Sequence, residues 1–377
     1  MILRSILLIS ILVLSFQSSS QNWNNYSVLF GEASTELAPA KANVVRIFID
    51  KNGFIYPDIA IKDRKLRRSE SSVEQYLIDH PETLHALYQE YDVPDVIDFP
   101  RTLLLLEAIA NRKVQEINEK LNNYTSVSAI IHGFRKRAYG NAGYLSTADN
   151  VALHRDLQTN SRNMLIIEVY WDGTFISGVR GYKYRGFRLL EEQAIPNAHK
   201  VGVGLRRVLS SIETDTLNVV GHSLGAMVVT DLLFDKIPPQ PYTHSPVTPP
   251  QRINACLLAP AIGSEEFTGY WNRSIENALD NYQFFIFHNE NDFVLNKTFD
   301  VGPIHLDLAP TEYGNTSLGC DYNGDVGKLL HLFDGFSAQS NLPILIDVSQ
   351  RSDGRAMGCH LLRCYSRLEK FTSLPIW

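Results

Sequence analysis

The fold of this chain is decided by residues 217–233, which read LNVV-GHSLG-AMVVTDLL. The apolar residues before the glycine-bounded motif predict a strand, and the small and apolar residues after it predict a helix. Gly221 and Gly225 lack the Cβ atoms that would collide inside a tight strand-to-helix turn. His222, between them, is a predicted supporting residue of this turn. Ser223 lies at the tip of this turn. The pattern therefore predicts a nucleophilic serine, the alternative being a purely structural turn.

Backbone amides beside this serine could stabilise a negatively charged oxygen. The helix that begins there has unsatisfied N–H groups and a positive end, so Leu224 N–H is the natural first donor. The second donor should follow an early strand, and residues 129–134 read AIIHGF. In that loop Gly133 allows close approach of the backbone, Phe134 N–H would donate, and His132 would support the loop.

A serine hydroxyl needs a general base, which is itself oriented by a carboxylate. In chains with such an elbow, the acid follows the serine and the histidine follows the acid. Asp292 comes directly after an apolar strand and is the predicted acid, with Glu290 as its rival and a turn-capping role as its alternative. His360 follows the last strong strand signal and is the predicted base, with His305 and His331 as competitors.

These motifs resemble the α/β-hydrolase superfamily, and in particular bacterial α/β-hydrolases of unknown function with a GHSLG elbow. Residues 169–171 (VYW) and 258–261 (LAPA) add to the resemblance, although Ala261 stands where those proteins usually have an acid. Residues 358–362 read GCHLL, where that family tends to have G-H-S-x-[YF]. The resemblance covers about residues 126–370 and implies a mostly parallel central sheet with helices on both faces. It also implies a serine hydrolase of the carboxylic ester type.

The strand pattern supports the same architecture. Short apolar strands are predicted at residues 127–131, 164–170, 217–220, 253–258, 283–288 and 343–348. Helix-length segments separate most of them, for example residues 195–212 and 223–236. Strands alternating with crossover helices are typical of a parallel sheet covered on both faces, which is an α/β fold.

The residues before this region predict an N-terminal extension. Strands at 43–49 and 54–61 around a turn at 51–53 predict a β-hairpin, and residues 71–91 and 101–121 predict two helices. The expected division is a signal peptide (1–20), the N-terminal extension (21–125) and an α/β-hydrolase catalytic domain (126–377).

Composition and the N-terminus narrow the function further. The chain has 377 residues, 44% of them hydrophobic, and a net charge of only −6. It combines no sustained basic face with a nucleic-acid motif, so nucleic acid is not an expected partner. Arg4 precedes the apolar run 6–16 and the small residues 18–20, which is typical of a secretory signal peptide. The run is too short for a membrane span, so we expect a secreted or periplasmic protein without further membrane association.

An oxidising compartment would allow a disulfide from Cys320 to Cys359 or Cys364, while spacing alone does not decide the pair. The proline-rich residues 238–250 cannot form regular structure. They could be a lid over the substrate or a stiff surface connection.

No metal or cofactor is expected. Residues 321–325 (DYNGD) resemble the opening of a calcium loop, but Leu332 occupies the twelfth position, where glutamate is required. The predicted partner is a small-molecule or lipid acyl substrate, and the oligomeric state stays open. Two other functions share these residues: a lipase acting at a lipid surface, and a non-catalytic binding protein that keeps the fold.

Overall fold

The computed structural model of this chain describes residues 28–29, 40–57, 60–61, 72–94, 100–134, 163–171, 173, 193–234, 252–267, 281–289, 292, 295, 298–301, 304–307, 318–320, 325–334 and 343–347. The predicted signal peptide, the proline-rich residues 238–250, Cys359, His360 and Cys364 lie outside these residues.

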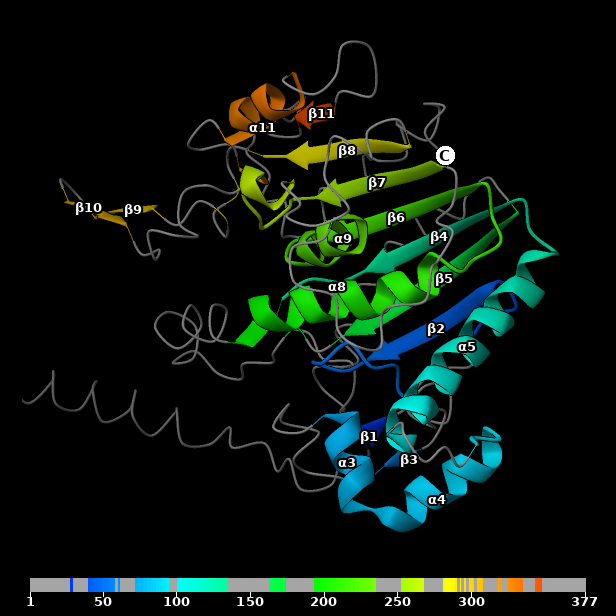
Figure 1. The fold of residues 1–377 in the computed structure, drawn as a ribbon. Helices are drawn as coiled ribbons and strands as arrows, with labels where there is room; N and C mark the ends of the chain where they lie inside the picture. Colours follow the sequence, from blue (N-terminus) through cyan, green and yellow to red (C-terminus); the bar gives the residue numbers. More distant parts are fainter. Residues whose placement is uncertain are drawn as a thin grey trace, which may run out of the picture.

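A seven-stranded parallel sheet forms the centre of the molecule (Figure 1). Its strands, in spatial order, are β11 (Ile344–Asp347), β8 (Tyr282–His288), β7 (Arg252–Leu258), β6 (Thr216–His222), β4 (Ser126–Ile131), β5 (Met164–Trp171) and β2 (Val44–Ile49). Every neighbouring pair is parallel. All six strands predicted after residue 126 are present, and the predicted α/β fold is confirmed.

Side chains on both faces of this sheet are buried, which explains why its strands are continuous apolar runs. All positions of β2, β5 and β8 are buried. On one face, Phe234, Phe267, Phe284 and Phe333 form an aromatic cluster with ring centroids 5.2–6.2 Å apart. These rings join α9 (Gly225–Leu233), η5 (Ser264–Phe267), β8 and α11 (Asp325–Asp334) into one core.

Three helices lie over this face (Figure 1). They are α8 (Ile195–Leu209), α9 (Gly225–Leu233) and α11 (Asp325–Asp334), with the short 3-10 helix η5 (Ser264–Phe267) beside them. The two helices α8 and α9 approach closely because Gly202 has no side chain. A Cβ at Gly202 would lie only 2.4 Å from the Cβ of Asp231.

The predicted N-terminal hairpin is present only in part. The chain does reverse after β2, and Ile49 makes a single antiparallel bridge with Ile55. However, β2 pairs in parallel with β5, so it forms the edge strand of the central sheet. The second predicted strand is reduced to β3 (Ala60–Ile61), which pairs with β1 (Val28–Leu29).

A buried ion pair gives a physical reason for this placement of β2. Arg46 of β2 and Glu168 of β5 are opposite one another, with Arg46 Nε 3.0 Å from Glu168 Oε2. Tyr170 donates its hydroxyl to the same carboxylate oxygen at 2.9 Å. Because either charge alone would be costly to bury, this pair favours one register of β2 against β5.

The single helix predicted over residues 71–91 is two helices, α3 (Val73–Asp79) and α4 (Pro81–Glu90). Pro81 cannot donate a backbone hydrogen bond, so it ends α3 and starts the next helix. The helix predicted at 101–121 is confirmed as α5 (Arg101–Leu121). An unpredicted antiparallel pair, β9 (Thr298–Val301) and β10 (Ile304–Asp307), contains His305.

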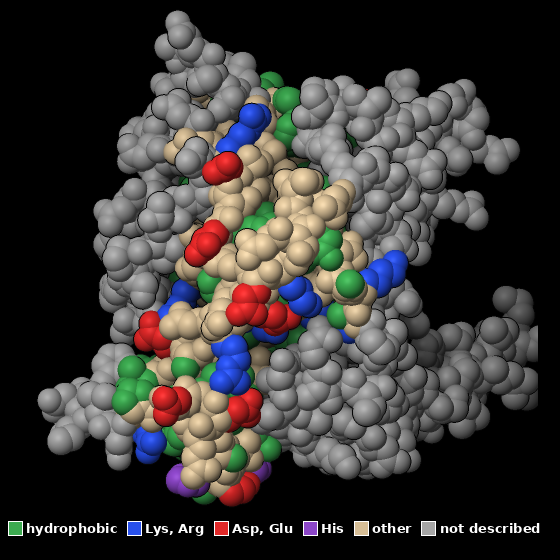
Figure 2. Space-filling model, turned by 90° about the vertical axis from the view of Figure 1, so that its right-hand side faces the viewer, with side chains coloured by type: hydrophobic (Ala, Val, Ile, Leu, Met, Phe, Trp, Pro, Cys, Tyr) green, Lys and Arg blue, Asp and Glu red, His purple; other side chains and the backbone are tan. Residues whose placement is uncertain are grey.

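The face of the molecule that includes α5 carries acidic and basic side chains close together (Figure 2). Arg112 pairs with Glu90, and Lys113 pairs with Glu116, at 3.1 Å and 2.7 Å respectively. Among the described residues, no helix is both long and apolar enough to cross a bilayer.

Candidate active site

Ser223 and Gly133 lie at the point where the connections of the sheet change direction. The chain leaves the carboxyl end of β4 toward β5 on one side, and it leaves the carboxyl end of the adjacent β6 toward β7 on the other side. In open parallel sheets, ligands bind at such a switch point. Gly133 follows β4 and Ser223 follows β6, so both predicted elements are brought together there.

The backbone of Ser223 has the left-handed conformation expected at a nucleophile elbow. Its φ is +55°, a value that non-glycine residues seldom adopt. The surroundings hold it in place, because Ser223 N–H donates to the Leu258 carbonyl at 2.9 Å. Its own carbonyl accepts from the amides of Ala226 and Ala261 at 3.0 Å and 3.1 Å. Such strain persists only where the fold over-determines it, and it is frequent at functional sites.

Three glycines allow the turn to pack against the end of β4. A Cβ at Gly133 would lie 2.7 Å from the Cβ of Ser223, and one at Gly225 would lie 2.6 Å from the His132 carbonyl oxygen. A Cβ at Gly221 would lie 2.8 Å from the Gly225 carbonyl oxygen. Each contact is too short for any larger residue, so all three glycines are required by packing.

The predicted oxyanion donors lie on the two sides of the serine. Leu224 is the N-cap of α9, and among the described residues nothing accepts a hydrogen bond from its N–H. His222, the last residue of β6, is buried directly before the serine. Phe134 is half-buried and packs against the main core, directly after Gly133.

The loop that carries Phe134 is braced by His132 and Trp171. The Trp171 backbone N–H donates to His132 Nε2 at 3.1 Å, so in the neutral ring the proton is on Nδ1. The Trp171 indole N–H donates to the His132 carbonyl at 2.7 Å, and the two rings stack 5.7 Å apart. Trp171 is therefore a supporting residue that the local sequence pattern did not identify as one.

His132 also orients the peptide that contains the predicted second donor. Its Nδ1–H donates to the Gly133 carbonyl at 3.0 Å. That carbonyl and the Phe134 N–H belong to one peptide, and among the described residues no peptide is cis. The two groups point in opposite directions in a trans peptide, so the ring fixes the direction of the Phe134 N–H.

Asp292 lies beyond the carboxyl end of β8, which is the same edge of the sheet as the elbow. It is completely buried. Its Oδ1 accepts the Leu295 N–H at 3.2 Å, and its own N–H donates to the Asn289 carbonyl at 2.9 Å. One carboxylate oxygen of Asp292 therefore caps the turn, which is the alternative role that the sequence analysis left open.

The histidine that would complete a triad is His360, which lies outside the described residues. Of its competitors, His331 is exposed on α11 and His305 lies in β10.

Cys256 and Cys320 are both buried, and burial raises the pKa of the Cys256 thiol well above its usual range.

Asp50 is a buried acid to which the sequence pattern assigned no role. It follows β2 at the same edge of the sheet, and its Oδ1 accepts the N–H groups of Asn52 and Phe54, both at 2.9 Å. Its Oδ2 accepts the Val73 N–H at 2.8 Å. Burial raises the pKa of this carboxyl from 3.8 to about 6, while the three amide hydrogen bonds limit the rise.

No protein-family profile and no curated protein sequence matches this chain. A partly similar solved structure is a protein of Lactobacillus plantarum WCFS1, provisionally described as a cell surface hydrolase. It is 10% identical, with a TM-score of 0.32, over 67% of this chain and 92% of that chain. The assignment of the fold therefore rests on the sheet order and the elbow described above.

Proposed function

We propose that this protein is a serine hydrolase that cleaves carboxylic ester or related acyl bonds through an acyl-enzyme. The observation that carries the proposal is the left-handed backbone of Ser223 at the β6–α9 turn, with Gly133 packed directly against it. A purely structural turn does not require a strained serine packed against a glycine loop, whereas a nucleophile held beside the two proposed amide donors does.

In the proposed reaction, Ser223 Oγ bonds to the acyl carbon and its proton passes to His360. Leu224 N–H and Phe134 N–H stabilise the negative charge on the carbonyl oxygen. His360 then protonates the leaving alcohol as the carbon–oxygen bond breaks, and Asp292 orients the imidazole. A water molecule, deprotonated by His360, releases the acid and restores Ser223.

A fluorophosphonate probe tests the nucleophile, because it phosphonylates only an activated serine. We expect the wild-type chain to be labelled and Ser223→Ala to be inert. Ser128→Ala is the matched control, since Ser128 is buried in β4 and its hydroxyl has no hydrogen-bond partner there. A folded wild type that is not labelled, or labelling that survives Ser223→Ala, would refute the proposal.

The predicted acid and base are tested with the same probe. His360→Ala and Asp292→Asn should still fold but react more slowly, because the serine loses its base or the base loses its orientation. If His305→Ala or His331→Ala slows labelling and His360→Ala does not, the base has been assigned to the wrong residue.

Substrate class and location follow as parts of this proposal. Hydrolysis of short- and long-chain acyl esters, with and without micelles, distinguishes an esterase from a lipase. The N-terminal signal pattern supports action outside the cytoplasm, and the mature N-terminus of the secreted protein would verify it.

A further inference from the structure

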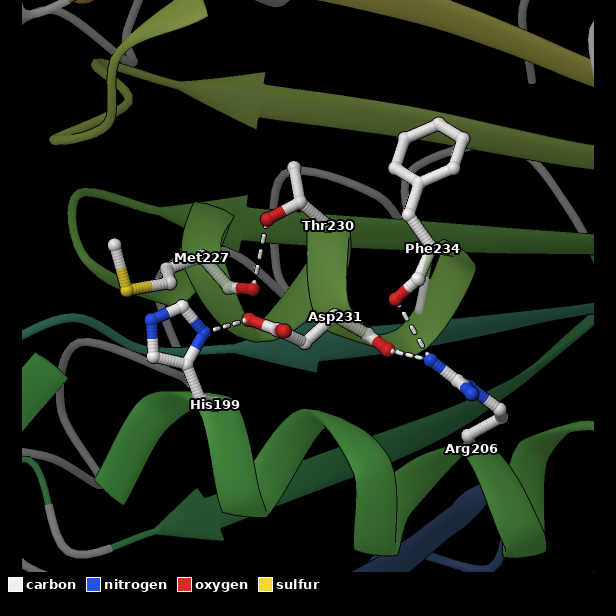
Figure 3. Close-up of polar contacts among 6 residues, drawn as sticks. All are labelled: His199, Arg206, Met227, Thr230, Asp231 and Phe234. Carbon is white, nitrogen blue, oxygen red and sulfur yellow. Dashed lines mark hydrogen bonds and ion pairs between the residues drawn. The ribbon is translucent and has the colours of Figure 1, made fainter. Parts of the chain in front are cut away.

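A second cluster of reactive side chains lies between α8, α9 and η5. His199 of α8, Asp231 of α9 and Glu266 of η5 each offer one potential ligand atom, and these atoms all lie within 4.8 Å of one another. Figure 3 shows His199 and Asp231 facing each other across the two helices, with His199 Nδ1 2.7 Å from Asp231 Oδ2. Sequence spacing gave no sign of this cluster, because the three residues are far apart in the chain.

The cluster gathers negative charge in a protected place. The carboxylates of Asp231 and Glu266 lie close together. Because Asp231 is completely buried and Glu266 is half-buried, water screens their charges only partly. The nearby Arg206 donates to the main-chain carbonyls of Asp231 and Phe234 (Figure 3), and also to that of Leu232.

We propose that His199, Asp231 and Glu266 bind a divalent transition-metal ion such as Zn²⁺. One imidazole nitrogen and two carboxylate oxygens are a donor set suited to Zn²⁺, Co²⁺ or Mn²⁺, whereas Ca²⁺ and Mg²⁺ prefer oxygen alone. Ligand atoms around zinc are roughly 3.3 Å apart. The 2.7 Å contact must therefore open by roughly 0.6 Å as the Nδ1 proton is replaced by the metal.

The site has access for a fourth ligand. The His199 side chain is 21% exposed, so water can reach the cluster and complete a four-coordinate shell. With Nδ1 bound to the metal, the ring proton is carried by Nε2.

The role of this ion is structural. Asp231 lies eight residues after Ser223, which corresponds to about 12 Å along a helix, so the ion does not contact the reacting atoms. It ties α9, which follows the elbow, to α8 on one side and η5 on the other. The segment before η5 also contacts the elbow, because the Ala261 N–H donates to the Ser223 carbonyl.

The test uses the full chain without an affinity tag, freed of metal with a chelator and titrated with Co²⁺. We expect the visible absorption of one tetrahedral Co²⁺ per chain, which Zn²⁺ displaces. Zn²⁺ at a hundredfold excess over its dissociation constant should raise the Tm by about 3 °C. His199→Gln and Glu266→Gln should each weaken binding at least about tenfold and abolish the Tm shift.

His331→Gln is the matched control, since it removes an exposed histidine on α11 and should bind Co²⁺ as the wild type does. If His199→Gln does not fold, Glu266→Gln answers the same question from a half-buried position. Absence of Co²⁺ bands and of a Tm shift at millimolar metal would overturn the proposal. Unchanged binding in both ligand variants would overturn it as well, and the cluster would then be a hydrogen-bonded contact between helices.

Discussion

The two ends of α9 differ in the hydrogen bonding of their backbone groups. At the start, the chain is strained at Ser223, and the Leu224 N–H donates to none of the described residues. At the other end, Arg206 of α8 binds the carbonyls of Asp231 and Phe234 (Figure 3), and also that of Leu232. Both ends are buried, so the difference does not come from solvent.

This difference separates the end of the helix that would serve the proposed function from the end that serves stability. Unsatisfied amides at a helix start are available to a ligand with developing negative charge. Carbonyls that are bound by a guanidinium stabilise the helix instead, and charge-assisted hydrogen bonds of this kind are strong. The well-anchored end thus helps the fold to tolerate the strained one.

The largest predicted effect is at the open end, with Gly133→Ala. The new Cβ would lie 2.7 Å from the Cβ of Ser223, so the loop must move and the Phe134 N–H with it. We expect labelling of Ser223 by the fluorophosphonate to slow by about 100-fold, the usual effect of losing one oxyanion donor.

The control is Gly327→Ala on α11, where the added Cβ would have no atom within 4 Å. It should label at the wild-type rate. Equal rates for both variants would mean that the loop after β4 does not take part in the site.

The next effect concerns the anchored end, with Arg206→Met. This change removes the donor for the last carbonyls of α9 and should lower the free energy of unfolding by about 3–4 kcal/mol. Urea denaturation measures it. Labelling of the folded variant should stay within about threefold of wild type, because the elbow is at the far end of the helix.

Arg112→Met is its control, since that arginine pairs with Glu90 at an exposed position. It should cost less than about 1 kcal/mol. A large loss of labelling in the folded Arg206→Met protein would contradict the division of the helix into two independent ends.

A third prediction concerns Asp50, a buried carboxyl at the same edge of the sheet as the elbow, whose two oxygens accept three amide hydrogen bonds. Its pKa is raised to about 6 in the folded protein, so folding favours the protonated form. The stabilisation is complete below pH 3.8 and is lost as the pH rises through about 6, by about 2–3 kcal/mol. The free energy of unfolding of the wild type, measured by denaturation, should fall between pH 4.5 and pH 7.5. In Asp50→Asn this fall should be about 2 kcal/mol smaller. Identical pH dependence in the two proteins would refute the raised pKa of Asp50.

The smallest effect is expected for Trp171→Phe. It keeps an aromatic ring beside His132 but removes the 2.7 Å bond to the His132 carbonyl, at a cost of about 1 kcal/mol. Labelling should slow by less than about tenfold. The neighbouring Tyr170→Phe removes the bond to Glu168 instead and should leave the labelling rate unchanged. If Tyr170→Phe slows labelling as much, His132 is not the link between Trp171 and the site.

Much of the architecture was readable from local patterns. Apolar strands, crossover helices and the glycine-bounded turn are signals confined to a few residues, and they predicted the α/β fold, α5 and the place of the elbow. The edge position of β2 could not be read in this way. A strand followed by a tight turn predicts a hairpin, and only the parallel partner β5 and the Arg46–Glu168 pair decide otherwise.

The sequence by itself determined the residue types of the proposed site: a serine between glycines, a His-Gly loop, and a candidate acid and histidine in the order that the proposal requires. Tertiary structure decided how Gly133 meets Ser223, how Trp171 and His132 hold the loop, and that His199 lies against Asp231. The physical reason is distance along the chain. Steric demands within a turn act between neighbours and appear in the sequence, whereas contacts between separate strands and helices exist only once the sheet order has brought those elements together.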